Sequence, residues 1–149
     1  MTTLDDSGDD SGGYAGDVTS AEAFEMLSAD PAAVLVDVRT VPEWQFVGVA
    51  DLAALGREPV YLSWQVYPDM VVRPDFVQAL RDRGIGPDQT VLLLCRSGVR
   101  SRAAAIALAG AGFGRAYNIS DGFEGGLDGQ GRRGRVAGWR AAGLPWVQQ

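Results

Sequence analysis

Two short apolar runs, VLVDV at Val34–Val38 and VLLL at Val91–Leu94, constrain the fold of this chain most strongly. Strands that are apolar on both sides are typical of a parallel sheet covered on both faces. Neighbouring parallel strands need crossover connections, which are usually helices. The segments around these runs have the spacing of apolar residues that indicates helices. A length of 149 residues is typical of a single domain. The sequence therefore predicts an α/β fold with a small, mostly parallel central sheet flanked by helices.

The remaining elements are predicted from helix-start, helix-stop and strand signals. Thr19 and Glu22 match a capping box at the start of a helix that ends near Ala29. The other expected elements are a helical turn at Pro42–Phe46, a strand at Val60–Trp64, a helix that Pro74 opens and Gly84 follows, a helix over Ser101–Leu108 that closes near Gly112, a strand at Ala116–Ile119, a long loop at Asp121–Arg135 and a helical turn at Trp139–Ala142.

The formal net charge of −6 is concentrated at the start of the chain. The first 17 residues hold five acidic residues and no basic one, so we expect an acidic disordered tail over 1–17 and a folded domain over 18–149. The rest of the chain has 14 acidic residues and 13 arginines, so we expect no nucleic-acid partner. The start lacks the pattern of a secretory signal, and the longest apolar stretch, around Ala103–Ala111, is too short to cross a membrane. We therefore expect a cytoplasmic protein without a membrane partner.

The residue types that this chain lacks exclude several kinds of site. The sequence has no histidine and no lysine, so all 13 basic residues are arginine, and its one cysteine is Cys95. This excludes a nucleophile activated by histidine, a zinc site built within one chain from histidines or several cysteines, and a phosphate-binding lysine. We expect no metal and no cofactor. Cys95 is either an inert core residue or a reactive thiol.

Cys95 follows the VLLL run and precedes a glycine-containing loop and a helix. In an open parallel sheet, ligands bind beyond the carboxyl ends of the strands. A tight loop turns N–H groups inward and the helix adds its positive end, and both favour the thiolate form of Cys95. Arg96, Arg100 and Arg102 add positive charge, although Arg102 also fits a solvated helix position. Because a core strand does not normally run straight into charge and glycine, the pattern favours a reactive thiol.

The segment CRSGVRS at Cys95–Ser101, followed by an alanine-rich helix, resembles the active-site loop of the rhodanese family of sulfurtransferases. Three further segments resemble motifs of that family, in the same order, along most of Val18–Trp146. They are Asp37-Val38-Arg39 with Glu43, Asn118-Ile119 with Asp121–Gly126, and Gly138–Pro145. The resemblance implies a rhodanese-like domain over 18–149 with the activity of a thiosulfate sulfurtransferase.

The resemblance also implies a mechanism. Cys95 attacks the outer sulfur of a small anionic donor such as thiosulfate, and a thiol, cyanide or a protein acceptor then takes the sulfur from the Cys95 persulfide. Loop N–H groups hold this persulfide. The active-site loop residues are Arg96, Ser97, Gly98, Val99, Arg100 and Ser101. Arg100 orients the donor and Arg96 assists at the mouth of the pocket. The Ser97 and Ser101 hydroxyls donate to the loop or the substrate, and Ser101 fits a helix N-cap equally well.

We predict other roles for residues outside this loop. Asp37 ends the neighbouring strand, where its carboxylate is placed to brace the loop from behind. Arg39 and Glu43 are spaced for a structural ion pair, which we favour over contact with substrate. Where the rhodanese family often has Gly-His-Ile-Pro-Gly-Ala, this chain has GVADL at Gly48–Leu52. The segments that either line the pocket or pack as satellite core are Trp64–Met70 and Gly126–Arg135.

Two other functions stay open for Cys95. A cysteine-dependent phosphatase uses cysteine, five residues and then arginine, but this chain has Ser101 at the arginine position. A carrier that hands its persulfide to a partner protein would have the same sequence as an enzyme. Fast thiosulfate:cyanide turnover supports the enzyme, and a stable persulfide with negligible turnover supports the carrier.

Overall fold

The computed structural model describes residues 13–126, 129–133 and 137–148, and its centre is a sheet of five strands. In spatial order the strands are β2 (Gly16–Val18), β9 (Ala116–Ile119), β8 (Val91–Leu94), β3 (Val34–Asp37) and β5 (Val60–Tyr61). Every neighbouring pair is parallel, so the carboxyl ends of all the strands lie at one edge. The predicted α/β fold with a mostly parallel central sheet is confirmed.

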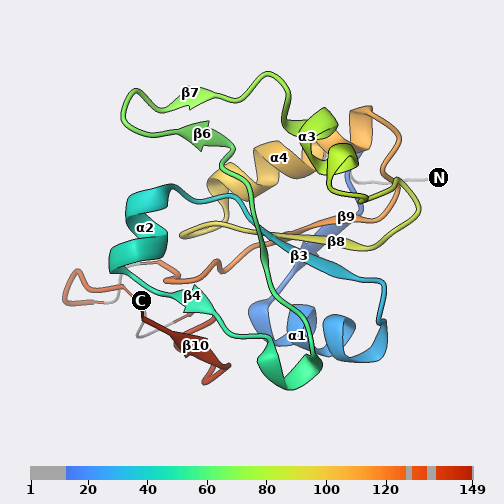
Figure 1. Ribbon diagram of the computed structural model, residues 1–149. Helices are drawn as coiled ribbons and strands as arrows, with labels where there is room; N and C mark the ends of the chain where they lie inside the picture. Colours follow the sequence, from blue (N-terminus) through green and yellow to red (C-terminus); the bar gives the residue numbers. More distant parts are fainter. Residues whose placement is uncertain (1–12, 127–128, 134–136, 149) are drawn as a thin grey trace.

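Helices cover both faces of this sheet (Figure 1). α1 (Ser20–Ala29) lies on one face, and α3 (Phe76–Asp82) and α4 (Val99–Gly110) lie on the other. All four residues of β8 are buried. Val91 and Leu93 pack in the apolar cluster that includes residues of α3 and α4, whereas the other two residues of β8 pack in the cluster that includes α1. Burial on both faces explains why this strand is apolar throughout.

Local signals set the ends of the helices. α1 begins after Thr19, whose hydroxyl accepts from the Glu22 N–H while the Glu22 carboxylate accepts from the Thr19 N–H, so the predicted capping box is confirmed. α4 begins at Val99, after Gly98, which has a left-handed φ of 101°. A Cβ on Gly98 would overlap a backbone carbonyl of a neighbouring loop, so the site requires glycine. Ser101 lies inside α4, and an N-cap role for it is wrong.

The folded chain begins earlier than residue 18. β2 pairs with β9 in parallel, and Tyr14, only 7% exposed, packs in the core cluster beside α4. The expected boundary after residue 17 is therefore too late, and residues 1–12 of the expected tail lie outside the described residues. The sequence did not predict β2, because a strand of three residues with a glycine and an aspartate lacks the alternation of apolar and polar residues that indicates a strand.

Several short elements differ from the expectations or were not expected. They are α2 (Val41–Phe46), longer by one residue than the expected turn, a 3₁₀ helix at Ala53–Leu55, the antiparallel pair β4 (Val49–Ala50) with β10 (Trp146–Val147), and the hairpin of β6 (Gln65–Val66) with β7 (Val71–Val72). The expected strand at Val60–Trp64 is only the two residues of β5. The segment Trp139–Ala142 forms hydrogen-bonded turns without a helix. In the part of the chain described here, no helix is long and apolar enough to cross a membrane.

Candidate active site

Cys95 directly follows β8, at the edge where the carboxyl ends of the parallel strands meet. A cavity of about 400 Å³ lies at this position. The residues that line it are Glu43, Gln65, Met70, Cys95, Arg96, Ser97, Val99 and Arg100. Gly98 and Ser101, the other two residues of the predicted loop, are buried behind this surface. The structure thus brings the predicted loop together around one cavity.

Three polar groups surround the buried Cys95 sulfur. The N–H groups of Gly98 and Ser101 donate to Sγ at 3.1 and 3.4 Å. The Ser101 hydroxyl oxygen lies 3.2 Å from the same sulfur. Ser101 belongs to the first turn of α4, where unpaired N–H groups and the helix dipole favour negative charge. The arrangement is suited to hold an anionic sulfur at the start of α4.

A chain of polar side chains extends from the sulfur to the exposed Asp17 of the edge strand β2. The Ser101 hydroxyl donates to Asn118 Oδ1 at 2.5 Å, and Asn118 Nδ2 donates to Asp17 Oδ1 at 3.0 Å. The Tyr14 hydroxyl donates to the same Asp17 oxygen at 2.7 Å. Burial raises the pKa of Tyr14, and the Asp17 carboxylate raises it further, so this hydroxyl stays protonated at neutral pH. No role for Tyr14 or Asp17 was expected from the sequence, because only the pairing of β2 with β9 brings them near Cys95.

The loop after β9 packs on the loop that carries Cys95. The N–H groups of Phe123 and Glu124 donate to the carbonyls of Cys95 and Arg96 at 2.8 and 3.0 Å. Gly122 has a φ of 66°, and a Cβ at this position would overlap the backbone at Arg96. The glycine-rich motif after β9 therefore fixes the position of the loop by close backbone contact.

Arg100 is bound by Glu43 at the wall of the cavity. Its Nη1 and Nη2 atoms donate to the two carboxylate oxygens at 2.7 and 2.9 Å. Glu43 Oε1 also accepts from the N–H and the hydroxyl of Thr40. Burial raises the pKa of the Glu43 carboxyl, but the Arg100 guanidinium and the Thr40 donors lower it more, to about 2. The hydrogen bond with Glu43 in turn raises the pKa of Arg100. Both side chains are therefore ionised at neutral pH.

The expected ion pair between Arg39 and Glu43 is wrong. The Arg39–Glu43 ion pair does not form, because Glu43 binds Arg100 and the buried Arg39 binds Asp37, with Nη2 2.8 Å from Oδ2. The Asp37 carboxylate is occupied by Arg39 and does not brace the Cys95 loop directly. The Arg39 guanidinium carbon lies 4.4 Å from the centre of the Phe123 ring. The Asp37–Arg39 pair therefore supports the loop only indirectly, through Phe123.

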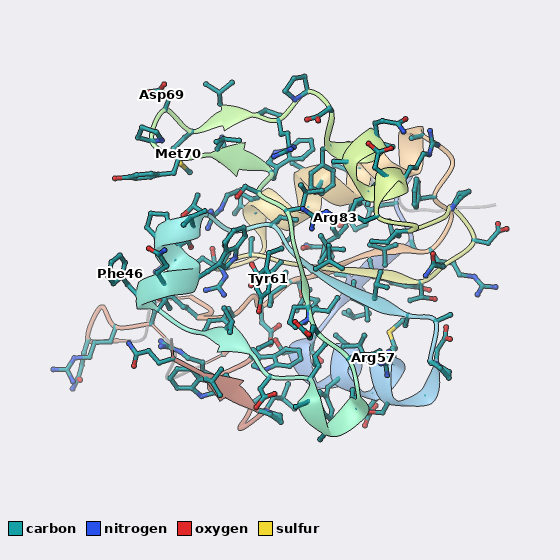
Figure 2. The ribbon with its side chains drawn as sticks, viewed as in Figure 1. Phe46, Arg57, Tyr61, Asp69, Met70 and Arg83 are labelled. Carbon is teal, nitrogen blue, oxygen red and sulfur yellow. The ribbon has the colours of Figure 1, made fainter. Side chains whose placement is uncertain are left out.

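The segment Trp64–Met70 has both of its expected roles. Trp64 packs edge-to-face on Phe76, with ring centres 5.2 Å apart, and joins the core. Gln65 and Met70 line the cavity. Figure 2 shows Met70 at the tip of the β6–β7 hairpin, on the same side of the molecule as α2. The hairpin thus supplies one wall of the cavity.

The remaining predicted residues lie elsewhere. Arg102 does not line the cavity, and its guanidinium carbon lies 5.8 Å from the centre of the Tyr14 ring. The segment Gly126–Arg135 is described at residues 126 and 129–133, and none of these lines the cavity. Among the described residues, no group of three or more histidine, cysteine, aspartate or glutamate side chains is placed to hold a metal ion.

A comparison with known protein families matches residues 15–149 to the STR4 middle domain. The chain belongs to this family. A relative of this chain is Rhodanese-like domain-containing protein 4, chloroplastic, of Arabidopsis thaliana, which is 28% identical over 131 residues, 87% of this chain and 25% of that protein. The fold is therefore rhodanese-like.

Other relatives extend this comparison. An uncharacterized protein of Rickettsia conorii is 37% identical over 87% of this chain and 94% of its own length, and a sulfurtransferase of Allochromatium vinosum is 31% identical over 61% of this chain and 73% of its own length. The crystal structure of Rv0390 from M. tuberculosis has a TM-score of 0.83 and 54% identity, covering 91% of this chain and 99% of that one. The polysulfide-sulfur transferase of Wolinella succinogenes has a TM-score of 0.59 and 21% identity, covering 89% and 78%, which supports the fold alone.

Proposed function

We propose that this protein is a sulfurtransferase that moves a sulfane sulfur atom through a persulfide on Cys95. The observation that carries the proposal is the position of Cys95, which lines a cavity and whose Sγ accepts hydrogen bonds from the N–H groups of Gly98 and Ser101 at the start of α4. The relatives named as a sulfurtransferase and as a rhodanese-like protein support the same reaction class.

The transfer has two balanced steps. In the first, the Cys95 thiolate attacks the outer sulfur of the donor, a new S–S bond forms, and the donor's S–S bond breaks so that its remainder leaves with the electron pair. With thiosulfate the leaving group is sulfite. In the second step a thiolate or cyanide attacks the terminal sulfur, and the electron pair of the broken bond returns to Cys95 as thiolate. Neither step needs an external oxidant or reductant.

The residues around the sulfur have distinct roles in these steps. The N–H groups of Gly98 and Ser101 stabilise negative charge on sulfur without rearranging, because the helix start fixes them. The exposed Arg96 attracts an anionic donor to the cavity mouth. Arg100 holds the wall of the cavity through Glu43.

Intact-protein mass spectrometry tests the proposal. The wild type should gain the mass of one sulfur atom after incubation with a sulfane donor and lose it again with cyanide. Cys95→Ser should gain none. A wild type that gains no sulfur from any donor, or a serine variant that gains it equally, would show that the proposal is wrong. A stable persulfide that neither cyanide nor thiols discharge would instead identify a carrier for a protein acceptor.

A further inference from the structure

The charges that line the cavity nearly cancel. Among the described residues of its wall, the ionised side chains are Glu43, Arg96 and Arg100, so the wall has a net charge of one positive unit. A thiolate on Cys95 reduces the sum to zero. The cavity therefore offers little net attraction to a donor that carries two negative charges.

Glu43 is held where its charge acts on the cavity. It makes a bidentate ion pair with Arg100, and the two side chains are only 19% and 17% exposed, so solvent screens the pair less than a surface pair. The Thr40 N–H and hydroxyl also donate to Oε1 of this carboxylate. The two hydrogen bonds from Arg100 are already made, and an incoming oxyanion must break them to be bound in the same bidentate way.

Arg96 is the remaining cation of the wall. Its side chain is exposed, and it has no ion pair with any carboxylate in the described part of the chain. An exposed single charge is screened by salt, so Arg96 alone balances at most one charge of a donor. Thiosulfate, a dianion, would keep one charge unbalanced close to the Glu43 carboxylate.

The rest of the cavity suits a donor with an organic arm. Met70 and Val99 give the wall apolar surface and are 38% and 77% exposed, and Gln65 gives it a neutral amide. A volume of about 400 Å³ lies in the usual range for small organic ligands and far exceeds the few atoms of thiosulfate. The β6–β7 hairpin is the element that provides this additional wall.

We propose that Glu43 determines the specificity of this site and that the donor is an organic persulfide, R–S–SH or its monoanion, rather than thiosulfate. This inference rests on the proposed transfer through Cys95. The organic arm lies along Met70, Gln65 and Val99, and Arg96 balances one charge. The neutralisation of Arg100 by Glu43 disfavours dianions.

The first step is balanced for such a donor. The Cys95 thiolate attacks the terminal sulfur of R–S–SH, a new S–S bond to Cys95 forms, and the S–S bond of the donor breaks. The proton stays on the transferred sulfur, and R–S⁻ leaves with the electron pair. The products are the Cys95 persulfide and a thiolate, with no change in the number of sulfane sulfur atoms.

Loading rates of the wild type provide a first test. This test uses no substitution, so misfolding of a variant cannot explain its result. We would measure the rate at which Cys95 gains sulfur from persulfides of 2-mercaptoethanol, 3-mercaptopropionate and mercaptosuccinate, whose arms carry increasing negative charge at a similar S–S bond. The rate should fall by about threefold or more for each added charge. A rate that rises with the charge of the arm would contradict the inference.

Glu43→Gln provides the second test. Removal of this charge should raise the rate of loading from thiosulfate, relative to the rate with the neutral-arm persulfide, by about tenfold. Glu43→Asp, which keeps the charge, should not raise the thiosulfate rate. Glu25→Gln makes the same change in net charge at an exposed position of α1, on the opposite face of the sheet, and should affect neither rate. An equal effect of Glu43→Gln on both donors would overturn the assignment.

The failures of the two proposals are distinguishable. If no donor loads sulfur onto Cys95, the proposed transfer is wrong and the donor question disappears. If thiosulfate loads the wild type as fast as the persulfides do and Glu43→Gln leaves that rate unchanged, the transfer through Cys95 stands, and both the preference for a persulfide donor and the role of Glu43 are refuted.

Discussion

The ion pair between Glu43 and Arg100 should make the stability of this protein depend on pH in the acid range. The folded state lowers the pKa of Glu43 from 4.5 to about 2, so the folded protein binds the proton more weakly than the unfolded chain does. The resulting stabilisation is fully present above pH 4.5 and is lost as the pH falls toward about 2. At about 1.36 kcal/mol for each pH unit, this difference corresponds to about 3 kcal/mol.

Urea unfolding of the wild type and Glu43→Gln between pH 7 and pH 2.5 measures this contribution. The glutamine side chain of the variant mimics the protonated carboxyl, because its amide oxygen can still accept from the Thr40 N–H and hydroxyl while the charge is lost. The wild type should be more stable by about 3 kcal/mol at pH 7, and the difference should shrink steadily below pH 4.5. Glu25→Gln, at an exposed position, should differ from the wild type by less than about 0.5 kcal/mol at every pH. A difference between wild type and Glu43→Gln that is constant with pH would refute the assignment of this stabilisation to the ionised pair.

Two further predictions concern the support of the Cys95 loop and of β2. Gly122→Ala should abolish sulfur loading and lower the free energy of unfolding by about 1–3 kcal/mol, because the left-handed φ of Gly122 and the nearby Arg96 backbone leave no room for a Cβ. Gly126→Ala is the control, since the space around its Cβ is open, and this variant should load sulfur normally in the same mass-spectrometric assay. Tyr14→Ala should lower the free energy of unfolding measured with urea by about 3–5 kcal/mol, because Tyr14 is buried in the core. The control Tyr67→Ala, at a 58% exposed position, should change this free energy by less than about 0.5 kcal/mol. Equal effects of the two substitutions would mean that the start of the chain does not belong to the core.

Which parts of the site could be predicted depends on whether their residues are neighbours in the sequence or are brought together by folding. Cys95 and the loop to Ser101 are contiguous in sequence, so the strand, the glycine and the helix start were visible together. The ion pair of Arg100 could not be predicted, because its partner Glu43 is 57 residues away in the chain. In the sequence, Arg39 lies nearer to Glu43 and was predicted as its partner. Burial decided between them, since Arg39 enters the core, where Asp37 compensates its charge.

The beginning of the fold shows the same limit. The strand β8 was predicted because burial on both faces makes it apolar throughout, and β3 was predicted because it is apolar up to its last residue, Asp37. The strand β2 is an edge strand of three residues, and its role depends on hydrogen bonds to β9, about 100 residues later. Such a strand leaves no periodic pattern, so composition assigned Tyr14 and Asp17 to the tail although both are joined to the site through Asn118.

By itself, the sequence determined the α/β fold, the two central strands and the position of Cys95 at the end of one of them, because these depend on local pattern. The tertiary structure alone decided which charges compensate one another around that cysteine. A carboxylate binds the cation that packing brings within hydrogen-bond distance, and in this protein packing brings Arg100 to Glu43 and Arg39 to Asp37. The charge of the cavity is therefore a property of the fold.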